Sequence, residues 1–147
     1  MATRTKYKSA YYEHKGPTMR NISRHYNPTL AKNYFEMLVA YMHSNPIRVN
    51  TNLYRGINTN LMRKLLKNGY LNDNYLSSFS KNKNIAKGFT NNLLGKVLVL
   101  NKGRYPAINE KNHGNTPERE VTLAPGRYTL VGVTPNGNLK VTYTPKR

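Results

Sequence analysis

Pro117–Gly126 reads PEREVTLAPG and carries a clear structural pattern. Val121 and Leu123 alternate with their neighbours, and a Pro-Gly pair follows, which predicts a half-buried strand that ends in a turn. On a strand, residues i and i+2 face the same side, about 6.5–7 Å apart. Glu118 and Glu120 are therefore predicted to point into one site, with Arg119 turned away.

These two carboxylates stand in a sequence that is poor in acids. The chain has six Asp and Glu residues against 24 Lys and Arg residues. A pair of carboxylates on one face suits chemistry at a sugar C1. One acid stabilises an oxocarbenium-like centre through the neighbouring hydroxyl, and the other handles the incoming nucleophile.

Length and composition limit the classes of protein to consider. With 147 residues the chain is expected to form one main domain. Its net charge of +18 predicts a polyanionic partner or environment, without making the protein a nucleic-acid reader. Cysteine is absent, the histidines lack metal-ligand spacing, and no apolar run is long enough to span a membrane, so we expect no metal and no membrane partner. The chain is also expected to be a monomer.

Residues 1–24 are predicted to form a basic N-terminal arm ahead of a domain over residues 25–147. The arm holds six Lys or Arg residues and one acid, Glu13, with no sustained periodicity. Its interleaved tyrosines could stack on bases while the cations contact phosphates. The alternative is a solvated tail that keeps the protein in solution.

The first half of this domain is predicted to contain two helices around one short strand. The first helix starts at Asn27-Pro28 and stops at Ser44, and the second is capped by Thr59 or Asn60 and ends at Gly69. Between them, Leu53–Ile57 is strand-like and contains Arg55. An arginine in an apolar strand either lies at an edge and faces solvent, or provides a guanidinium fork for a phosphate or a carboxylate.

The rest of the chain is predicted to be rich in strands. Tyr75–Ser80 reads as a strand followed by a short helix that Ser80 caps, and residues 95–100 read as a buried strand. Residues 127–133 and 139–143 alternate around Pro135-Asn136-Gly137, which indicates a hairpin. Helices first and strands last predict an α+β domain of packed, mainly antiparallel sheets.

Three motifs in this order resemble the R-S-E class of mono-ADP-ribosyltransferases. They are Leu53-Tyr54-Arg55-Gly56, then Ser78-Phe79-Ser80 with Ala86 and Phe89 behind it, then Glu118-Arg119-Glu120-Val121 with Pro125-Gly126. The resemblance runs from about Asn27 to Val133. It implies a split β-sandwich that holds NAD between two mainly antiparallel sheets, with helices on the N-terminal side.

The resemblance also implies a role for each matching position. Arg55 would grip the NAD phosphates and ribose, and the Gly56 backbone would lie against the nicotinamide carboxamide. Ser78, the first residue of a cofactor-binding segment completed by Phe79 and Ser80, would hold the nicotinamide ribose and orient Glu120. Glu120 would bond the ribose 2′-hydroxyl as positive charge develops at C1′, with nicotinamide as leaving group. Glu118 would engage the guanidinium of an acceptor arginine.

Two positions depart from the family pattern. Phe79 stands where the family usually has threonine, and it is expected to contribute packing. Asn115 stands where toxin relatives often have an aromatic residue that touches the protein substrate, which leaves the acceptor open.

Three functions follow from these patterns. The leading one is an NAD-dependent transferase that moves ADP-ribose to protein arginine. The alternatives are the same fold acting on nucleic acid or hydrolysing NAD, and a non-catalytic module that binds polyanions. The Glu pair weighs against the last of these, because a phosphate-binding surface gains nothing from buried carboxylates.

Overall fold

The computed structural model describes residues 28–83, 96–109 and 120–146. The chain divides into two compact units, Met1–Pro46 and Ile47–Arg147. The predicted basic arm, Glu118 and the helix expected after Ser80 lie outside the described residues, so the predicted division at residue 24 stays a prediction. No described helix is long and apolar enough to cross a membrane.

Helix α3 (Pro28–Ser44) is the described element of the first unit, and it occupies the predicted range. Proline suits its first position because the first turn of a helix leaves its N–H groups without intrahelical partners. Leu38 and Met42, one turn apart, are both fully buried. The helix therefore has an apolar stripe on one side.

Helix α4 (Thr59–Asn68) belongs to the second unit and has a cap at each end. The N-cap is Asn58, one residue before the predicted Thr59, because the Asn58 side chain accepts a hydrogen bond from the Leu61 N–H at 2.9 Å. Gly69 ends the helix with φ of 81°, a left-handed conformation that favours glycine. Leu65 buries the inner face of the helix.

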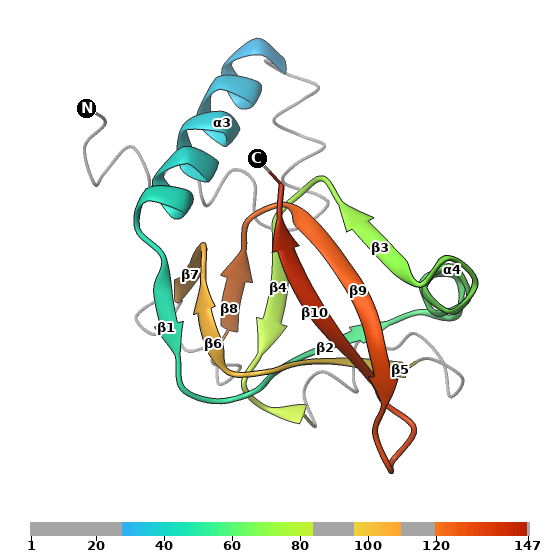
Figure 1. Cartoon of the computed structure of the whole chain (residues 1–147). Coiled ribbons are helices and arrows are strands. Elements are labelled where there is room, and N and C mark those ends of the chain that lie inside the picture. The colour runs from blue at the N-terminus through green and yellow to red at the C-terminus, as the bar shows by residue number, and fades with distance from the viewer. Residues whose placement is uncertain (1–27, 84–95, 110–119, 147) are drawn as a thin grey trace. The chain divides into compact units, whose positions relative to one another are not determined.

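The strands form a two-stranded sheet, β1-β6, and an eight-stranded sheet with the order β3-β9-β10-β5-β2-β4-β8-β7. Among the described strand pairs, β5 and β10 run parallel and the others run antiparallel. Figure 1 shows β4 and β8 standing roughly upright while β2 crosses beneath them. The strand bounds are β1 Ile47–Val49, β2 Leu53–Ile57, β3 Tyr70–Asp73, β4 Ser77–Ser80, β5 Lys96–Leu100, β6 Gly103–Tyr105, β7 Ala107–Asn109, β8 Glu120–Leu123, β9 Gly126–Val133 and β10 Leu139–Pro145.

The large sheet folds back on itself, and its two halves share one apolar core. A single residue pair, Tyr54 with Ser80, joins β2 to β4 in the described register. Phe79 of β4 packs against Tyr128 of β9, with ring centroids 5.6 Å apart, although these strands are not neighbours in the sheet. Face-to-face packing of this kind is that of a β-sandwich, so the predicted α+β fold with mainly antiparallel sheets is confirmed.

Two predictions need correction, one on the order of the elements and one on the burial of β8. Strands and helices are interleaved in the first half, because β1 and β2 precede α4 and β3 follows it. Strand β8 is also more buried than the predicted half-buried strand, since Thr122 and Ala124 are as inaccessible as Val121 and Leu123. The predicted hairpin is confirmed: β9 and β10 pair around a turn in which Gly137 has φ of 80°.

Candidate active site

The strands that carry the three sequence motifs are neighbours, in the order β2-β4-β8. Ser80 of β4 lies opposite Tyr54 of β2 and also opposite Glu120 of β8. The chain therefore brings together segments that are far apart in sequence. This arrangement places the Arg55 strand and the Glu120 strand on either side of the serine strand.

Arg55 lies on an interior strand and has a carboxylate partner. Strand β2 pairs with β5 on one side and β4 on the other, so the alternative of a solvent-facing edge arginine is wrong. Arg55 Nη1 donates to Asp73 Oδ2 at 3.2 Å, and about 29% of the Arg55 side chain is exposed. The ion pair holds one part of the guanidinium, while the side chain stays accessible to a ligand.

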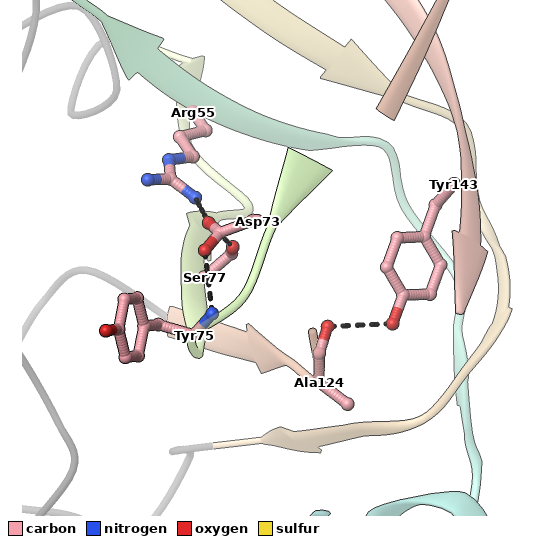
Figure 2. A network of polar contacts seen from close by, with 6 residues as sticks. All are labelled: Arg55, Asp73, Tyr75, Ser77, Ala124 and Tyr143. Atoms are coloured by element: carbon pink, nitrogen blue, oxygen red, sulfur yellow. Dashed lines mark hydrogen bonds and ion pairs between the residues drawn. The ribbon is translucent and has the colours of Figure 1, made fainter. Parts of the chain in front are cut away.

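Asp73 is the centre of a small polar network that joins three segments (Figure 2). Its Oδ2 accepts the Arg55 hydrogen bond and one from the Ser77 hydroxyl, and its Oδ1 accepts from the Tyr75 backbone N–H at 2.9 Å. Figure 2 shows the Tyr75 ring pointing away from the carboxylate. Asp73 therefore ties β2 to the end of β3 and the start of β4.

Tyr128 lies beneath this network and is almost fully buried. Among the described residues its hydroxyl makes no hydrogen bond of ordinary geometry. Burial raises the pKa of Tyr128 well above its usual value, although the Ser77 hydroxyl and the Arg55 charge act in the opposite direction. The phenol therefore stays neutral and keeps a proton to donate beside Arg55.

The serine segment splits between two faces of β4. Ser77 and Phe79 are buried, with Phe79 packed against Tyr128 in the core, and this fits the packing role expected for Phe79. Ser78 is exposed and lies opposite Thr122. Ser80 is buried, and its Oγ accepts a hydrogen bond from the Asn82 N–H at 2.9 Å, the contact expected of a residue that caps the following segment.

Glu120 is the first residue of β8 and is partly buried. Alternate residues of a strand face opposite sides, so Glu120, Ser80 and Tyr54 share one face. Arg55 lies on the other face of β2, toward the core, where its guanidinium is 6.0 Å from the Phe79 ring centroid. The register therefore sends the Arg55 and Glu120 side chains to different faces of the sheet, on strands β2 and β8 that are separated by β4. Gly56 shares the Tyr54 face and pairs with Val97.

The turn after β8 is held by Tyr143 of β10. Its hydroxyl donates to the carbonyl oxygen of Ala124 at 2.8 Å, with Pro125 O at 3.3 Å (Figure 2). Burial raises the pKa of Tyr143 as well, with a further contribution from the nearby Asp73 charge. A protonated phenol thus fixes the segment that follows Glu120.

The sequence motifs do not include Asp73, Ser77 or Tyr128. One feature of the sequence could have indicated Asp73. It is the single aspartate of an acid-poor chain, and it precedes Ser77 by four residues. No group of His, Cys, Asp and Glu that could hold a metal occurs among the described residues.

No protein-family model matches this sequence, and a search of curated proteins finds no significant relative. Solved structures do match. The structure of C3stau2 from S. aureus with NAD has a TM-score of 0.67 at 15% identity, over 98% of this chain and 89% of that one. The C3larvin toxin, an ADP-ribosyltransferase from Paenibacillus larvae, has a TM-score of 0.57 at 15% identity, over 97% and 89%.

A third similar structure is the ADP-ribosyltransferase Vis from Vibrio splendidus in complex with agmatine. It has a TM-score of 0.52 at 15% identity, over 98% of this chain and 70% of that one. A sequence identity of 15% to each of these structures supports a similarity of fold only. The chain therefore has the ADP-ribosyltransferase fold.

Proposed function

We propose that this protein is an NAD-dependent mono-ADP-ribosyltransferase that moves ADP-ribose to an arginine side chain of a protein. The observation that carries the proposal is the adjacency of β2, β4 and β8, which puts Ser80 opposite both Tyr54 and Glu120. The fold that surrounds these strands is shared with C3stau2, whose structure was determined with NAD.

The residues at the site suit a dinucleotide substrate. Arg55 is partly exposed, and a guanidinium has five N–H donors, so it can contact a phosphate while it keeps its bond to Asp73. We also assign Gly56 of β2 and the β4 residues Ser78, Phe79 and Ser80 to NAD binding, with Phe79 acting through packing.

Glu120 is the proposed catalytic carboxylate. As the bond between C1′ and the nicotinamide nitrogen breaks, its electron pair leaves with nicotinamide and positive charge develops on the ribose. A carboxylate hydrogen-bonded to the 2′-hydroxyl stabilises that charge more in the transition state than in the ground state. The acceptor nitrogen then forms the new bond to C1′, and Glu118 is the proposed partner of the acceptor guanidinium.

Arginine is the proposed acceptor for two reasons. The sequence has the Glu-x-Glu spacing at Glu118 and Glu120. Vis, which shares the fold, was crystallised with agmatine, a small guanidinium compound. A nucleic-acid acceptor or plain NAD hydrolysis remains the second candidate, favoured by the net charge of +18.

The test compares Glu120→Gln, Glu118→Gln and a control, Glu36→Gln, by following nicotinamide release and transfer of labelled ADP-ribose to agmatine. Glu36 is an exposed residue of α3 whose ion pair with Lys32 spans 3.9 Å. Glu120→Gln is expected to lower both reactions about a hundredfold or more. Glu118→Gln is expected to lose transfer to agmatine and keep most NAD hydrolysis. Near-normal turnover of a folded Glu120→Gln protein contradicts the proposal.

A further inference from the structure

A second polar site lies at the ends of β3, β9 and β10, away from Glu120. It is an open pocket of about 610 Å³. Its lining mixes apolar and polar surface, and besides Asp73 its polar groups are two cations among amides and hydroxyls: Asn72, Asn74, Arg127, Thr129, Thr144 and Lys146. The site is rich in hydrogen-bond donors, which is the chemistry that receives an anion.

The hydrogen-bond partners of the two cations in this pocket are neutral groups. Arg127 Nε donates to Asn72 Oδ1 at 2.8 Å, and Lys146 Nζ donates to Asn74 Oδ1 at 3.2 Å. Both acceptors are neutral amides, so each bond orients a cation without neutralising it. The acid on the pocket wall is Asp73, whose charge is offset by Arg55 and whose two oxygens already accept hydrogen bonds.

The guanidinium of Arg127 is also held by an aromatic ring. It lies 4.1 Å from the ring centroid of Tyr70, a partly exposed residue of the adjacent strand. This contact and the Asn72 bond together fix the plane of the guanidinium at the pocket. A fixed, planar donor group is what bidentate recognition of a phosphate requires.

Arg127 lies on a different face of the sheet from Tyr128 and Arg55, although the pocket wall also includes Asp73, the partner of Arg55. Arg127 pairs with Asn72 and is exposed, whereas the next residue, Tyr128, points into the core beside Arg55. The two cations of the pocket are therefore distinct from the residues assigned to NAD, while Asp73 belongs both to the pocket wall and to the Arg55 network. The role of the pocket does not depend on the transferase reaction.

Further cations lie on helix α4, which contacts β3 and β9 and directly precedes β3. Arg63, Lys64 and Lys67 of this helix are all exposed. Within the described part of Ile47–Arg147 the acids are Asp73 and Glu120 alone. This scarcity of acids, in a chain with a net charge of +18, fits a chain of phosphates better than one small anion.

We infer that Arg127 and Lys146 bind phosphate groups of a single-stranded nucleic acid, with Tyr70 beside Arg127. Backbone contacts of this kind give affinity without sequence preference, and an aromatic residue among the cations is typical of surfaces that bind single strands. A diphosphate of NAD at the same pocket is the other source of the same chemistry, and the experiment separates the two.

The experiment compares Arg127→Gln/Lys146→Gln with a control, Lys102→Gln/Arg104→Gln, in the full chain. Both variants remove one exposed arginine and one exposed lysine, and the control residues lie at and just before β6. Binding of a labelled 20-nucleotide DNA strand is followed by fluorescence anisotropy over a series of salt concentrations, and NAD hydrolysis is measured on the same samples. Thermal melting verifies that both variants are folded.

The pocket variant is expected to bind the strand about tenfold or more weakly at 0.1 M salt, with a salt slope reduced by about 1.4 for two lost phosphate contacts. The control is expected to lose less, and NAD hydrolysis should not change in either variant. Equal losses in both variants would mean diffuse charge attraction and overturn the site. A raised KM for NAD in the pocket variant alone would assign the pocket to the dinucleotide. Absence of NAD hydrolysis in the parent protein would count against the transferase proposal and leave this result standing.

Discussion

At the scale of single residues, Asp73 determines how Arg55 is presented. A carboxylate that accepts bonds from Arg55 and Ser77 fixes both side chains at the point where β2, β3 and β4 meet. Without it, a partly buried guanidinium would have to find another partner or turn toward solvent. We therefore treat Asp73 as a positioning residue that acts on NAD through Arg55.

The first prediction concerns Asp73→Asn. Asparagine keeps the shape but loses the charge-assisted hydrogen bond, so we expect KM for NAD to rise about tenfold while kcat changes less. Arg55→Lys, which keeps the charge and loses the planar fork, should act in the same direction. The decisive measurement is the double variant: if Asp73 acts through Arg55, Asp73→Asn adds little in the Arg55→Lys background. Additive effects, or a loss of Tm with no effect on KM, would indicate a structural role only.

A second prediction separates the two neighbouring serines. The family resemblance gives the ribose-binding role to Ser78, whereas the structure puts the Ser77 hydroxyl on Asp73 and leaves Ser78 exposed. Ser78→Ala is expected to lower kcat with little effect on KM for NAD, and Ser77→Ala to raise KM as Asp73→Asn does. If Ser77→Ala lowers kcat and Ser78→Ala changes neither kcat nor KM, the ribose-binding role belongs to Ser77, one residue before the position that the resemblance implies.

The sequence left two interpretations of Arg55 open, a solvent-facing edge residue and a guanidinium fork for a phosphate or a carboxylate, and it did not identify Asp73 as the partner. Asp73 is 18 residues away, at the end of a four-residue strand that shows no clear periodicity. Long-range pairs of this kind depend on strand register, which local patterns do not determine. Tyr128 could not be identified from the sequence either, because a tyrosine in an alternating strand usually serves packing. Its position near Ser77 and Arg55 is visible only in the structure.

At the scale of elements, the long and regular segments formed where the sequence predicted them. Helix α3, helix α4, β5 and the β9–β10 hairpin lie close to their predicted ranges because each has a sustained apolar period or a defined cap or turn. The strands β1, β3, β6 and β7 contain only three or four residues, too few to show a period. Yet β3 carries Asp73, so a strand that local patterns miss supplies part of the candidate site.

The β8–β9 turn depends on a close approach at Gly126. A Cβ at this position would lie 2.4 Å from Tyr143 Cε2 and 2.6 Å from the backbone oxygen of Thr144. The ring that occupies this space is the one whose hydroxyl bonds Ala124. Glycine is therefore required here by packing, and the turn it permits places the strand that starts with Glu120.

The third prediction follows from that contact. Gly126→Ala is expected to destabilise the protein by about 1–3 kcal/mol because the backbone of β10 must shift. Gly132→Ala is the matched control, since it lies in the same strand and a Cβ there has no heavy atom within 4 Å. Urea unfolding of the two variants compares them directly. A Gly126→Ala protein as stable as Gly132→Ala would contradict the proposed packing role.

At the scale of the whole molecule, charge and catalysis are expected to be separable. An NAD site needs only a few cations, whereas the chain has a net charge of +18. In the described part of the second unit, Arg55 is paired with Asp73, while Arg127 and Lys146 bond only neutral amides. Binding of a polyanion at the proposed pocket would therefore use cations other than those assigned to NAD.

The last prediction concerns residues 1–24, which hold six Lys or Arg residues and one Glu. If they form a basic arm, deleting them should leave NAD hydrolysis unchanged and weaken binding of the DNA strand, with a shallower salt slope. Because the arm and the Arg127–Lys146 pocket would contact different phosphates, their losses should add in a combined variant. An unchanged salt slope would make the segment a solvated tail. Loss of NAD hydrolysis on deletion would place these residues within the catalytic domain and move its boundary toward the N-terminus.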